Sequence, residues 1–414
     1  MKLSLLIAAI AFAASLTTTL ALHRFTTPDR WEYSTIAQNI VEGKGANYPW
    51  LGTNYYFYGS ALYPRLMAGV FRLTGGSEAA VLILQMALFA GLCVTIYFIA
   101  LRWFGTAVAA LGAVLAALHP GSLVFVGRLH DQILDALLIT VTFGLLLLVR
   151  PSTRLSAALL VGLVSGLAAA TRGTVLIFCV LWAFWFVAHA RRCRPAALRV
   201  VAVIAMGALV MLAPFLADGF RKYGEIVPLR TDNGVNFWVG NHDNASGTSY
   251  TLNDPPVAEI ATRPVSLVAG IDGMNEVEQS RAFNHAAVEF IQSHPGEFVR
   301  LFFKKLEYFW WFSPRSGLLY PVQWTLLYKL YYSVILTLAL IGLGVAWRSP
   351  RPVTRAGAQS FVLLAAGVSA AQALFYVDGR HRWELEPLLL VFTAVGFATV
   401  LRVFIPPQIP EIDA

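Results

Sequence analysis

Long apolar stretches separated by short charged loops set the pattern of this chain. They lie at about 4–22, 79–101, 105–120, 133–149, 156–171, 173–190, 198–217, 323–347, 358–377 and 384–405. An α-helix needs about 20 predominantly apolar residues to cross the hydrocarbon core of a bilayer, and most of the stretches reach or approach that length. The pattern therefore predicts an all-α polytopic membrane protein with about ten transmembrane helices.

The composition agrees with this class of protein. Of the 414 residues, 57% are hydrophobic and only 13% are charged, whereas soluble domains have roughly 45–50% apolar and about 25% charged residues. A net charge of +8 is also found in nucleic-acid-binding proteins. Here, however, much of the arginine lies in short loops between apolar stretches, where it orients a membrane protein. We therefore expect a lipid bilayer as partner and no nucleic acid.

The positions of arginine and lysine predict the orientation of the chain. Cations concentrate in alternate short loops, at Lys2, Arg102, Arg150, Arg154, Arg191, Arg192, Arg194, Arg199, Arg348, Arg351 and Arg355. If these loops are cytoplasmic, so are both termini, and the long segments 23–78 and 218–322 face outward. The chain then divides into an N-terminal transmembrane module (1–217, including 23–78), an outer loop region (218–322), and C-terminal transmembrane helices with a cytoplasmic tail (323–414).

The first apolar stretch has two interpretations. Lys2 followed by a Leu/Ala-rich run resembles a cleaved signal peptide. The residues before His23 form a poor cleavage pattern, which favours a retained first helix.

Several kinds of chemistry lack their sequence motifs. The chain has no Gly-rich loop ending in Lys-Ser or Lys-Thr, no His-Glu-x-x-His and no Gly-x-Ser-x-Gly, which disfavours ATPase, metalloprotease and serine-hydrolase sites. Its three cysteines have neither metal-ligand spacing nor a disulfide framework. A divalent metal stays open as a cofactor, but no motif indicates one.

Charged residues at the predicted outer ends of helices are the main candidates for chemistry. Asp29, Glu32 and Tyr33 follow the first helix. A spacing of four residues would place Asp29 and Tyr33 on one helix face. The alternative is structural, because an Asp after a Pro and before an amphipathic stretch is a common helix N-cap.

A second pair of carboxylates, Asp131 and Asp135, precedes and enters an apolar stretch. Two acids one turn apart repel each other unless a cation is close, and Arg128 and His130 are available for that. Stabilisation of the helix N-terminus could explain an acid in the first turn. Asp135 lies deeper, and ionisable groups inside membranes are usually functional.

Four basic residues could bind a phosphate. Arg172 lies between two apolar stretches, and Arg380, His381 and Arg382 precede the last one. Arginine binds phosphate through charge-assisted hydrogen bonds. The alternative is a side chain anchored at the membrane interface, although three basic residues in a row on the outer side run against the usual charge bias.

The segment 218–322 carries two further patterns. Asn233-Gly234 and Gly240-Asn241 predict tight turns that bring backbone amides close to a ligand or another loop. Residues 289–298 and the aromatic run 308–312 predict an amphipathic helix on the membrane surface.

Taken in order along the chain, these residues resemble the C-type glycosyltransferases that use polyprenyl-phosphate sugars, a superfamily that includes the protein O-mannosyltransferases and the lipid A aminoarabinose transferase. The matching motifs are Pro28-Asp29 with Tyr33 and Gly43, Leu62-Tyr63-Pro64, Gly166-Leu167-Ala168 with Thr171-Arg172, Asn233-Gly234, Gly240-Asn241, Glu289-Phe290-Ile291, His294-Pro295, and Arg380 and Arg382 before Glu386-Pro387. The resemblance covers nearly the whole chain. No single motif is highly specific, but their order and spacing together are.

This resemblance implies a catalytic Asp in the first outer loop and a second carboxylate at the outer end of a later helix. Asp29 matches the first position. Asp131 is our choice for the second, with Asp135 close behind, and Glu32 is a further candidate.

The resemblance also implies that basic groups hold the donor phosphate. Relatives often have Lys or Arg just before the Pro-Leu-Tyr stretch, where this chain has Gly59-Ser60-Ala61. Phosphate contacts are therefore expected from other basic residues, namely Arg65, Arg172, Arg380, His381 and Arg382. The candidate substrate-binding residues are Tyr33, Tyr63, Asn236 and Asn241.

The implied activity is inverting transfer of a hexose or pentose from a polyprenyl-phosphate donor to a lipid, glycan or protein acceptor. It implies a bacterial inner membrane location, with the site facing the periplasm or cell exterior. A transporter or flippase of a lipid-linked or anionic substrate is the alternative. The chain shows no inverted-repeat hydropathy, and its polar residues gather on one side rather than at the membrane midplane, which argues against a transporter. A structural scaffold would tolerate loss of Asp29.

Overall fold

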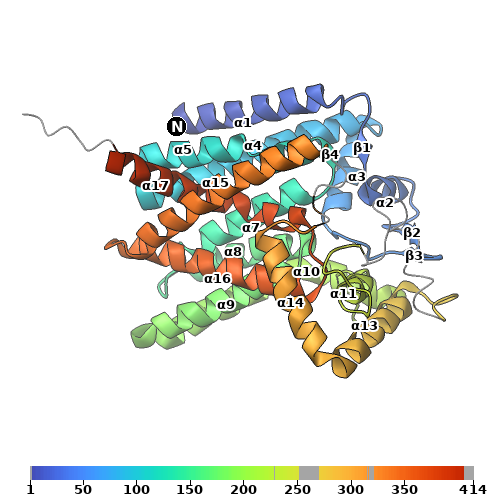
Figure 1. The fold of residues 1–414 in the computed structure, drawn as a ribbon. Coiled ribbons are helices and arrows are strands. Elements are labelled where there is room, and N and C mark those ends of the chain that lie inside the picture. Colours follow the sequence, from blue (N-terminus) through green and yellow to red (C-terminus); the bar gives the residue numbers. More distant parts are fainter. Residues whose placement is uncertain (1, 228, 251–269, 315, 317–320, 405–414) are drawn as a thin grey trace, which may run out of the picture.

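The computed structural model describes residues 2–227, 229–250, 270–314, 316 and 321–404. Every apolar stretch expected to be helical is a helix in this structure (Figure 1). These helices are α1 (Lys2–Ala21), α4 (Glu78–Phe104), α5 (Thr106–Ala117), α6 (Pro120–Val126), α7 (Gln132–Leu146), α8 (Leu155–Thr171), α9 (Thr174–His189), α10 (Arg194–Tyr223), α15 (Val322–Trp347), α16 (Pro352–Leu374) and α17 (Glu386–Phe404).

The helices differ in whether they can cross a membrane alone. Within the described ranges, five are long and apolar enough: α1, α4, α15, α16 and the stretch Arg191–Tyr223, which joins the short 3-10 helix η1 (Arg191–Cys193) to α10. Helices α5 and α6, bent by 51° at their junction, could form a sixth span together. Helices α7, α8, α9 and α17 are apolar but shorter. The structure thus supports a mostly helical membrane protein with five or six candidate spans, and the expected ten spans stay a prediction.

Glycine lets two of the apolar helices cross closely. A Cβ atom added to Gly342 in α15 would lie 1.9 Å from the carbonyl oxygen of Phe392, and one added to Gly396 in α17 would lie 1.9 Å from that of Leu338. Small residues at helix crossings let backbones approach within a bilayer, where the hydrophobic effect does not drive association. The α15–α17 pair therefore depends on hydrogen atoms at both positions.

The polar segments gather at one end of the helices (Figure 1). The first contains β1 (Asp29–Arg30), α2 (Glu32–Val41), β2 (Tyr48–Trp50), β3 (Thr53–Tyr55) and α3 (Tyr63–Thr74); the second contains α11 (Asn233–Gly240), α13 (Glu276–Ser293) and α14 (Pro295–Trp310). Strand β1 pairs in parallel with β4 (Arg128–Leu129), so that Asp29 lies opposite Arg128. A short 3-10 helix, η2 (Gly379–Glu384), joins α16 to α17 at the same end.

Glu276, the first residue of α13, ties the two polar segments together. It is fully buried. Its carboxylate accepts hydrogen bonds from the backbone N–H groups of Tyr56 (2.9 Å) and Phe57 (3.1 Å) in the first segment, from the Tyr223 hydroxyl (2.6 Å) and from the Thr231 hydroxyl. A buried carboxylate is tolerated only when its oxygens are satisfied in this way.

The prediction of tight turns around Asn233-Gly234 and Gly240-Asn241 is wrong. These pairs begin and end helix α11. A Cβ atom on Gly234 would lie 2.3 Å from the Ser280 carbonyl oxygen, and one on Gly240 would lie 2.5 Å from the Phe375 carbonyl carbon. Both glycines therefore allow close packing and do not form turns. The predicted C-terminal tail, 405–414, lies outside the described residues.

Candidate active site

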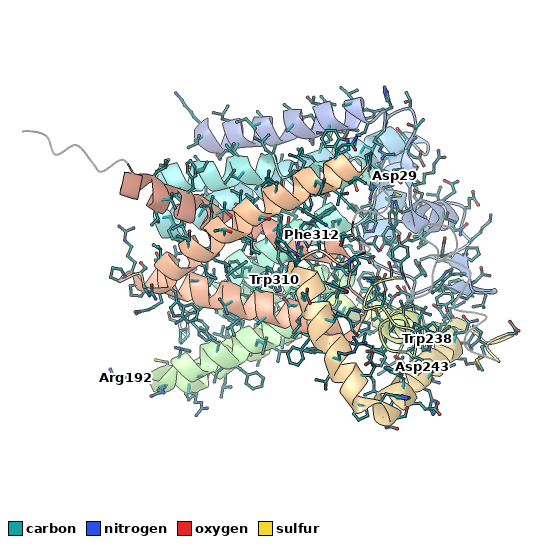
Figure 2. The ribbon with its side chains drawn as sticks, viewed as in Figure 1. Asp29, Arg192, Trp238, Asp243, Trp310 and Phe312 are labelled. Carbon is teal, nitrogen blue, oxygen red and sulfur yellow. The ribbon has the colours of Figure 1, made fainter. Side chains whose placement is uncertain are left out.

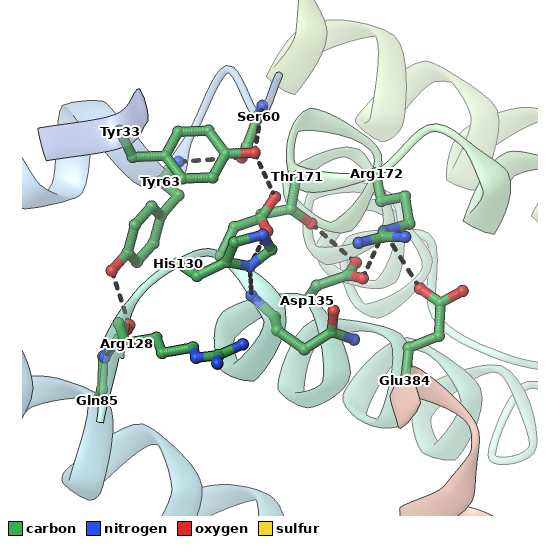
Figure 3. A network of polar contacts seen from close by, with 12 residues as sticks. Tyr33, Ser60, Tyr63, Gln85, Arg128, His130, Asp135, Thr171, Arg172 and Glu384 are labelled. Atoms are coloured by element: carbon green, nitrogen blue, oxygen red, sulfur yellow. Dashed lines mark hydrogen bonds and ion pairs between the residues drawn. The ribbon is translucent and has the colours of Figure 1, made fainter. Parts of the chain in front are cut away.

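Figure 3 shows a buried polar network at the start of α7. Asp131, the N-cap residue of that helix, belongs to this network through its contacts with Tyr33 and His130. Its side chain accepts a hydrogen bond from the Tyr33 hydroxyl (3.1 Å) and lies 2.9 Å from Nδ1 of His130. The Tyr33 oxygen in turn accepts from the backbone N–H of Ser60 (3.2 Å). Burial alone would raise the pKa of the Asp131 carboxyl, but His130 and the arginines outweigh it and hold that pKa below its ordinary value.

Arg172 holds two further carboxylates. It follows the last residue of α8, and its Nε lies 2.8 Å from Oδ2 of Asp135 and 3.3 Å from Oε2 of Glu384 (Figure 3). Asp135 and Glu384 are 2% and 0% exposed. Burial raises the pKa of Glu384 well above its ordinary value, and Asp135 adds to this although Arg172 opposes it. Two buried carboxylates thus share one arginine, which disfavours the charged form of Glu384.

Three arginines from separate segments lie near enough to His381 in η2 for their charges to act on its pKa. Arg172 is one; Arg230 pairs with Asp232 through two hydrogen bonds (3.1 and 2.6 Å), and Arg380 stacks over the Trp31 ring (5.1 Å to the centroid). Burial, followed by the charges of the three arginines, holds the pKa of His381 well below its ordinary value. The imidazole is therefore neutral, beside a concentration of positive charge that suits an anionic ligand.

Asp29 lies in strand β1 and not in a helix. Helix α2 begins at Glu32 with Trp31 as its N-cap, so the predicted shared helix face with Tyr33 and the alternative N-cap interpretation are both wrong. The carboxylate of Asp29 pairs with Arg24 (3.3 Å) and Arg128 (2.8 Å). Its side chain is 25% exposed, whereas those of Asp131 and Asp135 are 2% and 3% exposed. Asp29 is thus the aspartate of the three that a substrate can reach.

Glu32 is the first residue of α2 and borders the same network. Burial raises the pKa of Glu32, while the nearby charges of His130 and Arg380 lower it. The carboxyl group therefore belongs to the electrostatic surroundings of Asp131.

Two of the predicted phosphate ligands are directed at other groups. Arg382 is 1% exposed, bonds to Glu386 (2.6 Å) and to the Trp311 carbonyl (3.1 Å), and stacks on Tyr332 (4.0 Å to the centroid). The second such residue is Arg65, and the other three candidates lie in the site. Arg172, Arg380 and His381 lie together, whereas Arg65 faces α10, 3.6 Å from Asp218.

Of the four predicted substrate-binding residues, two form side-chain hydrogen bonds with acidic residues of the site. Tyr33 lies in the network, and the Asn236 side chain donates to Asp232, the partner of Arg230 (3.1 Å). The Tyr63 hydroxyl donates to Gln85 (2.7 Å), which holds the backbone carbonyls of Val126 and Arg128.

Asn241 has its side chain committed to the protein. It is fully buried and donates to the Phe237 and Leu374 carbonyls (both 2.7 Å). Its Oδ1 accepts from Lys305 of α14 (3.0 Å). Burial lowers the pKa of Lys305 to about 7.

Three of these residues carry little signal in the sequence. Arg230 precedes the Thr231-Asp232 pair, and this Arg-x-Asp spacing was its one signal. Glu384 stands in a run of basic residues, which drew attention to the cations alone. Lys305 lies in an amphipathic helix, where a lysine normally faces water, so the sequence does not indicate that this side chain is buried. Among the described residues, no group of three or more His, Cys, Asp or Glu side chains is arranged to hold a metal ion.

Comparison with known proteins bears on the class of this site. The family described as dolichyl-phosphate-mannose-protein mannosyltransferase matches residues 60–217. No protein of curated function matches the chain. The oligosaccharyltransferase AglB of Archaeoglobus fulgidus, solved with an inhibitory peptide and a dolichol-phosphate, is 13% identical with a TM-score of 0.55, and the match covers 97% of this chain and 51% of that one. The apo form gives a TM-score of 0.57 at 13% identity, with the same coverage.

ArnT from Cupriavidus metallidurans, bound to undecaprenyl phosphate, is 13% identical with a TM-score of 0.46, over 98% of this chain and 81% of that one. The present chain spans about half the length of the oligosaccharyltransferase that shares its fold. The family match at residues 60–217 and the fold shared with that enzyme confirm that this chain resembles the C-type membrane glycosyltransferase superfamily.

Proposed function

We propose that the chain transfers a sugar from a polyprenyl-phosphate donor to an acceptor hydroxyl, with inversion, at the outer face of the cytoplasmic membrane. One observation carries the proposal: Arg172 and Arg230 each contact buried carboxylates, and both lie, with Arg380, near enough to His381 for their charges to lower its pKa. The polar segments gather at the same end of the helices (Figure 1). The archaeal oligosaccharyltransferase of the same fold was solved with a lipid phosphate, dolichol-phosphate. This supports a ligand of the same chemical class here.

The arginines would bind the donor phosphate. Arg172 uses its Nε for Asp135 and Glu384, and Arg230 uses Nε and Nη2 for Asp232. Within the described part of the chain, neither residue has a hydrogen bond from its Nη1 atom, which leaves donors for a ligand. Donors fixed in advance stabilise the charge that grows on a leaving phosphate without further reorganisation.

Asp29 would act as the general base. Its carboxylate would accept the proton of the acceptor hydroxyl as that oxygen attacks the anomeric carbon and the bond from this carbon to the phosphate oxygen breaks. Polyprenyl phosphate leaves, and the arginines stabilise its charge. Arg24 and Arg128 fix the orientation of Asp29, and a base must lie within hydrogen-bond reach of the proton that it abstracts.

The site draws on all three proposed parts of the chain. Residues 1–217 contribute Asp29, Asp131 and Arg172, the outer region 218–322 contributes Arg230, and the C-terminal part 323–414 contributes Arg380. The N-terminal module alone would therefore lack two of the three phosphate ligands.

Release of polyprenyl phosphate from a labelled lipid-linked sugar by the purified protein tests the proposed function. A transporter or flippase would move the lipid between leaflets and leave the bond from the sugar to the phosphate intact. Absence of release with every acceptor class tested (lipid, glycan and peptide), together with measurable flipping, would favour the transporter.

Arg380→Gln should weaken donor binding by roughly ten- to a hundredfold. Loss of one charge-assisted contact removes about 1.5–3 kcal/mol, and each 1.4 kcal/mol is about tenfold in affinity. The measurement is binding of a labelled polyprenyl-phosphate sugar. Arg30→Gln is the matched control, because Arg30 forms an exposed pair with Glu78 and exposed pairs contribute little. Equal effects of the two changes would remove Arg380 from the phosphate site.

The proposed orientation makes a separate prediction. In a Cys193→Ser background, Asn244→Cys should react with an impermeant thiol reagent added to intact cells, and Ser152→Cys should react only after the cells are opened. Asn244 and Ser152 are both exposed, and the other native cysteines, Cys93 and Cys179, are buried or half-buried. The reverse labelling pattern would place the site on the cytoplasmic face.

A further inference from the structure

A groove with a volume of about 740 Å³ lies between the end of α14 and the first turns of α15. Figure 2 shows Phe312, one of its lining residues, just beyond the end of α14. Trp311, Lys304 and Lys329 also line it. None of the residues assigned above to the phosphate site or to the general base lines this groove.

The groove has an excess of positive charge. Lys304 and Lys329 lie near aromatic rings, with Nζ 5.6 Å from the Tyr308 centroid and 5.5 Å from the Phe312 centroid. Neither lysine forms an ion pair with any residue in the described ranges. Arg300, at the edge of the groove, has its charge paired with Glu297. Glu307 is the one acidic residue among the described residues lining the groove, so the two lysines outnumber the acids. This arrangement suits an anion.

The position of Lys329 along α15 suits a lipid headgroup. It lies seven residues beyond Val322, the first residue of this candidate span. At 1.5 Å per residue this is about 10 Å along the helix. A lysine near the end of a span can extend its long side chain back to the headgroup layer. Leu326, Leu327 and Leu330, which are 60%, 56% and 64% exposed, surround Lys329.

The apolar rim selects between kinds of anion. Phe303 in α14 is 64% exposed, and Trp311, the C-cap residue of that helix, is 41% exposed. A hydrated inorganic anion gains nothing from contact with these surfaces, whereas hydrocarbon chains do. Trp and Lys side chains are also typical of membrane interfaces, where an apolar body and a polar tip are both accommodated.

We propose that this groove binds the phosphate headgroup of an anionic membrane lipid, separate from the donor. Lys304 and Lys329 contact the phosphate through charge-assisted hydrogen bonds. The hydrocarbon chains lie along the exposed leucines of α15. The bound lipid thus joins α14 of the outer region to the first membrane-spanning helix that follows it.

The test is retention of labelled phosphatidic acid by the purified full chain in a neutral detergent. Wild-type protein should bind it at least tenfold more tightly than diacylglycerol, which lacks the phosphate. Lys304→Gln combined with Lys329→Gln should reduce the affinity for phosphatidic acid at least tenfold. Arg348→Gln combined with Arg351→Gln is the matched control: it removes the same charge beyond the other end of α15, where both residues are exposed.

Thermal unfolding of each variant without lipid shows that folding is retained. Equal loss of binding in the two double variants would show general attraction to positive charge, and unchanged binding in the lysine variant would exclude the groove. Displacement of the lipid by inorganic phosphate at similar concentrations would show an anion site without lipid selectivity. Each of these results overturns the proposal, and none depends on sugar transfer.

Discussion

Asp29→Asn should lower the turnover of sugar transfer by about 10²-fold or more while leaving the amount of folded protein unchanged. A positioned general base contributes about 10²–10⁴-fold. Asn keeps an oxygen that Arg24 and Arg128 can bind, but it cannot take a proton from the acceptor. Because Asp29 caps no helix, loss of a cap does not complicate the result. Single-turnover transfer by detergent-purified protein is the appropriate measurement.

Two further variants make this prediction sharper. Asp29→Glu should give a partial defect, because the extra methylene moves the carboxylate by roughly 1 Å, and misplacement of that size is costly. Asp218→Asn is the matched control, since Asp218 also contacts two arginines, Arg65 (3.6 Å) and Arg221 (3.4 Å), at a position remote from the proposed chemistry. A fully active Asp29→Asn protein would exclude Asp29 as the base and leave Asp131 or Glu32 as the candidate.

Arg172→Gln should destabilise the fold by about 3–5 kcal/mol. Removing one partner from a buried ion pair leaves the other charge uncompensated, and here Asp135 and Glu384 would both lose their cation. We expect little folded protein, measured by the unfolding midpoint in detergent and by size-exclusion chromatography. Arg65→Gln, which removes a half-exposed pair with Asp218, should have a much smaller effect.

A triple variant separates the structural part of Arg172 from its proposed part in catalysis. Arg172→Gln with Asp135→Asn and Glu384→Gln replaces all three ionisable side chains with neutral ones, so that no buried charge is left without its partner. This variant should regain the wild-type unfolding midpoint but should not regain donor binding. Recovery of both would show that Arg172 acts on the fold alone.

The helices could be predicted from the sequence because their signal is local. Each apolar stretch is visible in a window of about twenty residues. Its side chains are buried in hydrocarbon whichever helices it packs against, so the prediction needs no knowledge of the neighbours. Asp131, Asp135 and Arg172 could be predicted for a similar reason, since a charge within or beside an apolar stretch stands out. The expected shared face of Asp29 and Tyr33 failed because Asp29 pairs with Arg128, a residue far along the chain.

The remaining parts of the site depend on contacts that no local pattern encodes. Arg230 and Glu384 reach the cluster through the packing of polar segments, and spacing alone gives no measure of that distance. Asn241 carries an Asn-Gly type signal, yet its side chain is occupied by Lys305 and the end of α16. The fold is therefore needed to tell which polar residues of the outer segments can contact a ligand and which bind only to other parts of the protein.

The contact of Glu276 with Tyr56 has a consequence for synthesis of the protein. The two residues are 220 positions apart, and ribosomes add about 5–20 residues per second, so the first polar segment emerges roughly 10–40 s before its partner. During that interval the N–H groups of Tyr56 and Phe57 have no carboxylate to bind. A nascent chain that stalls before α13 would carry Asp29 on an unfinished surface, open to proteases and unable to hold substrate.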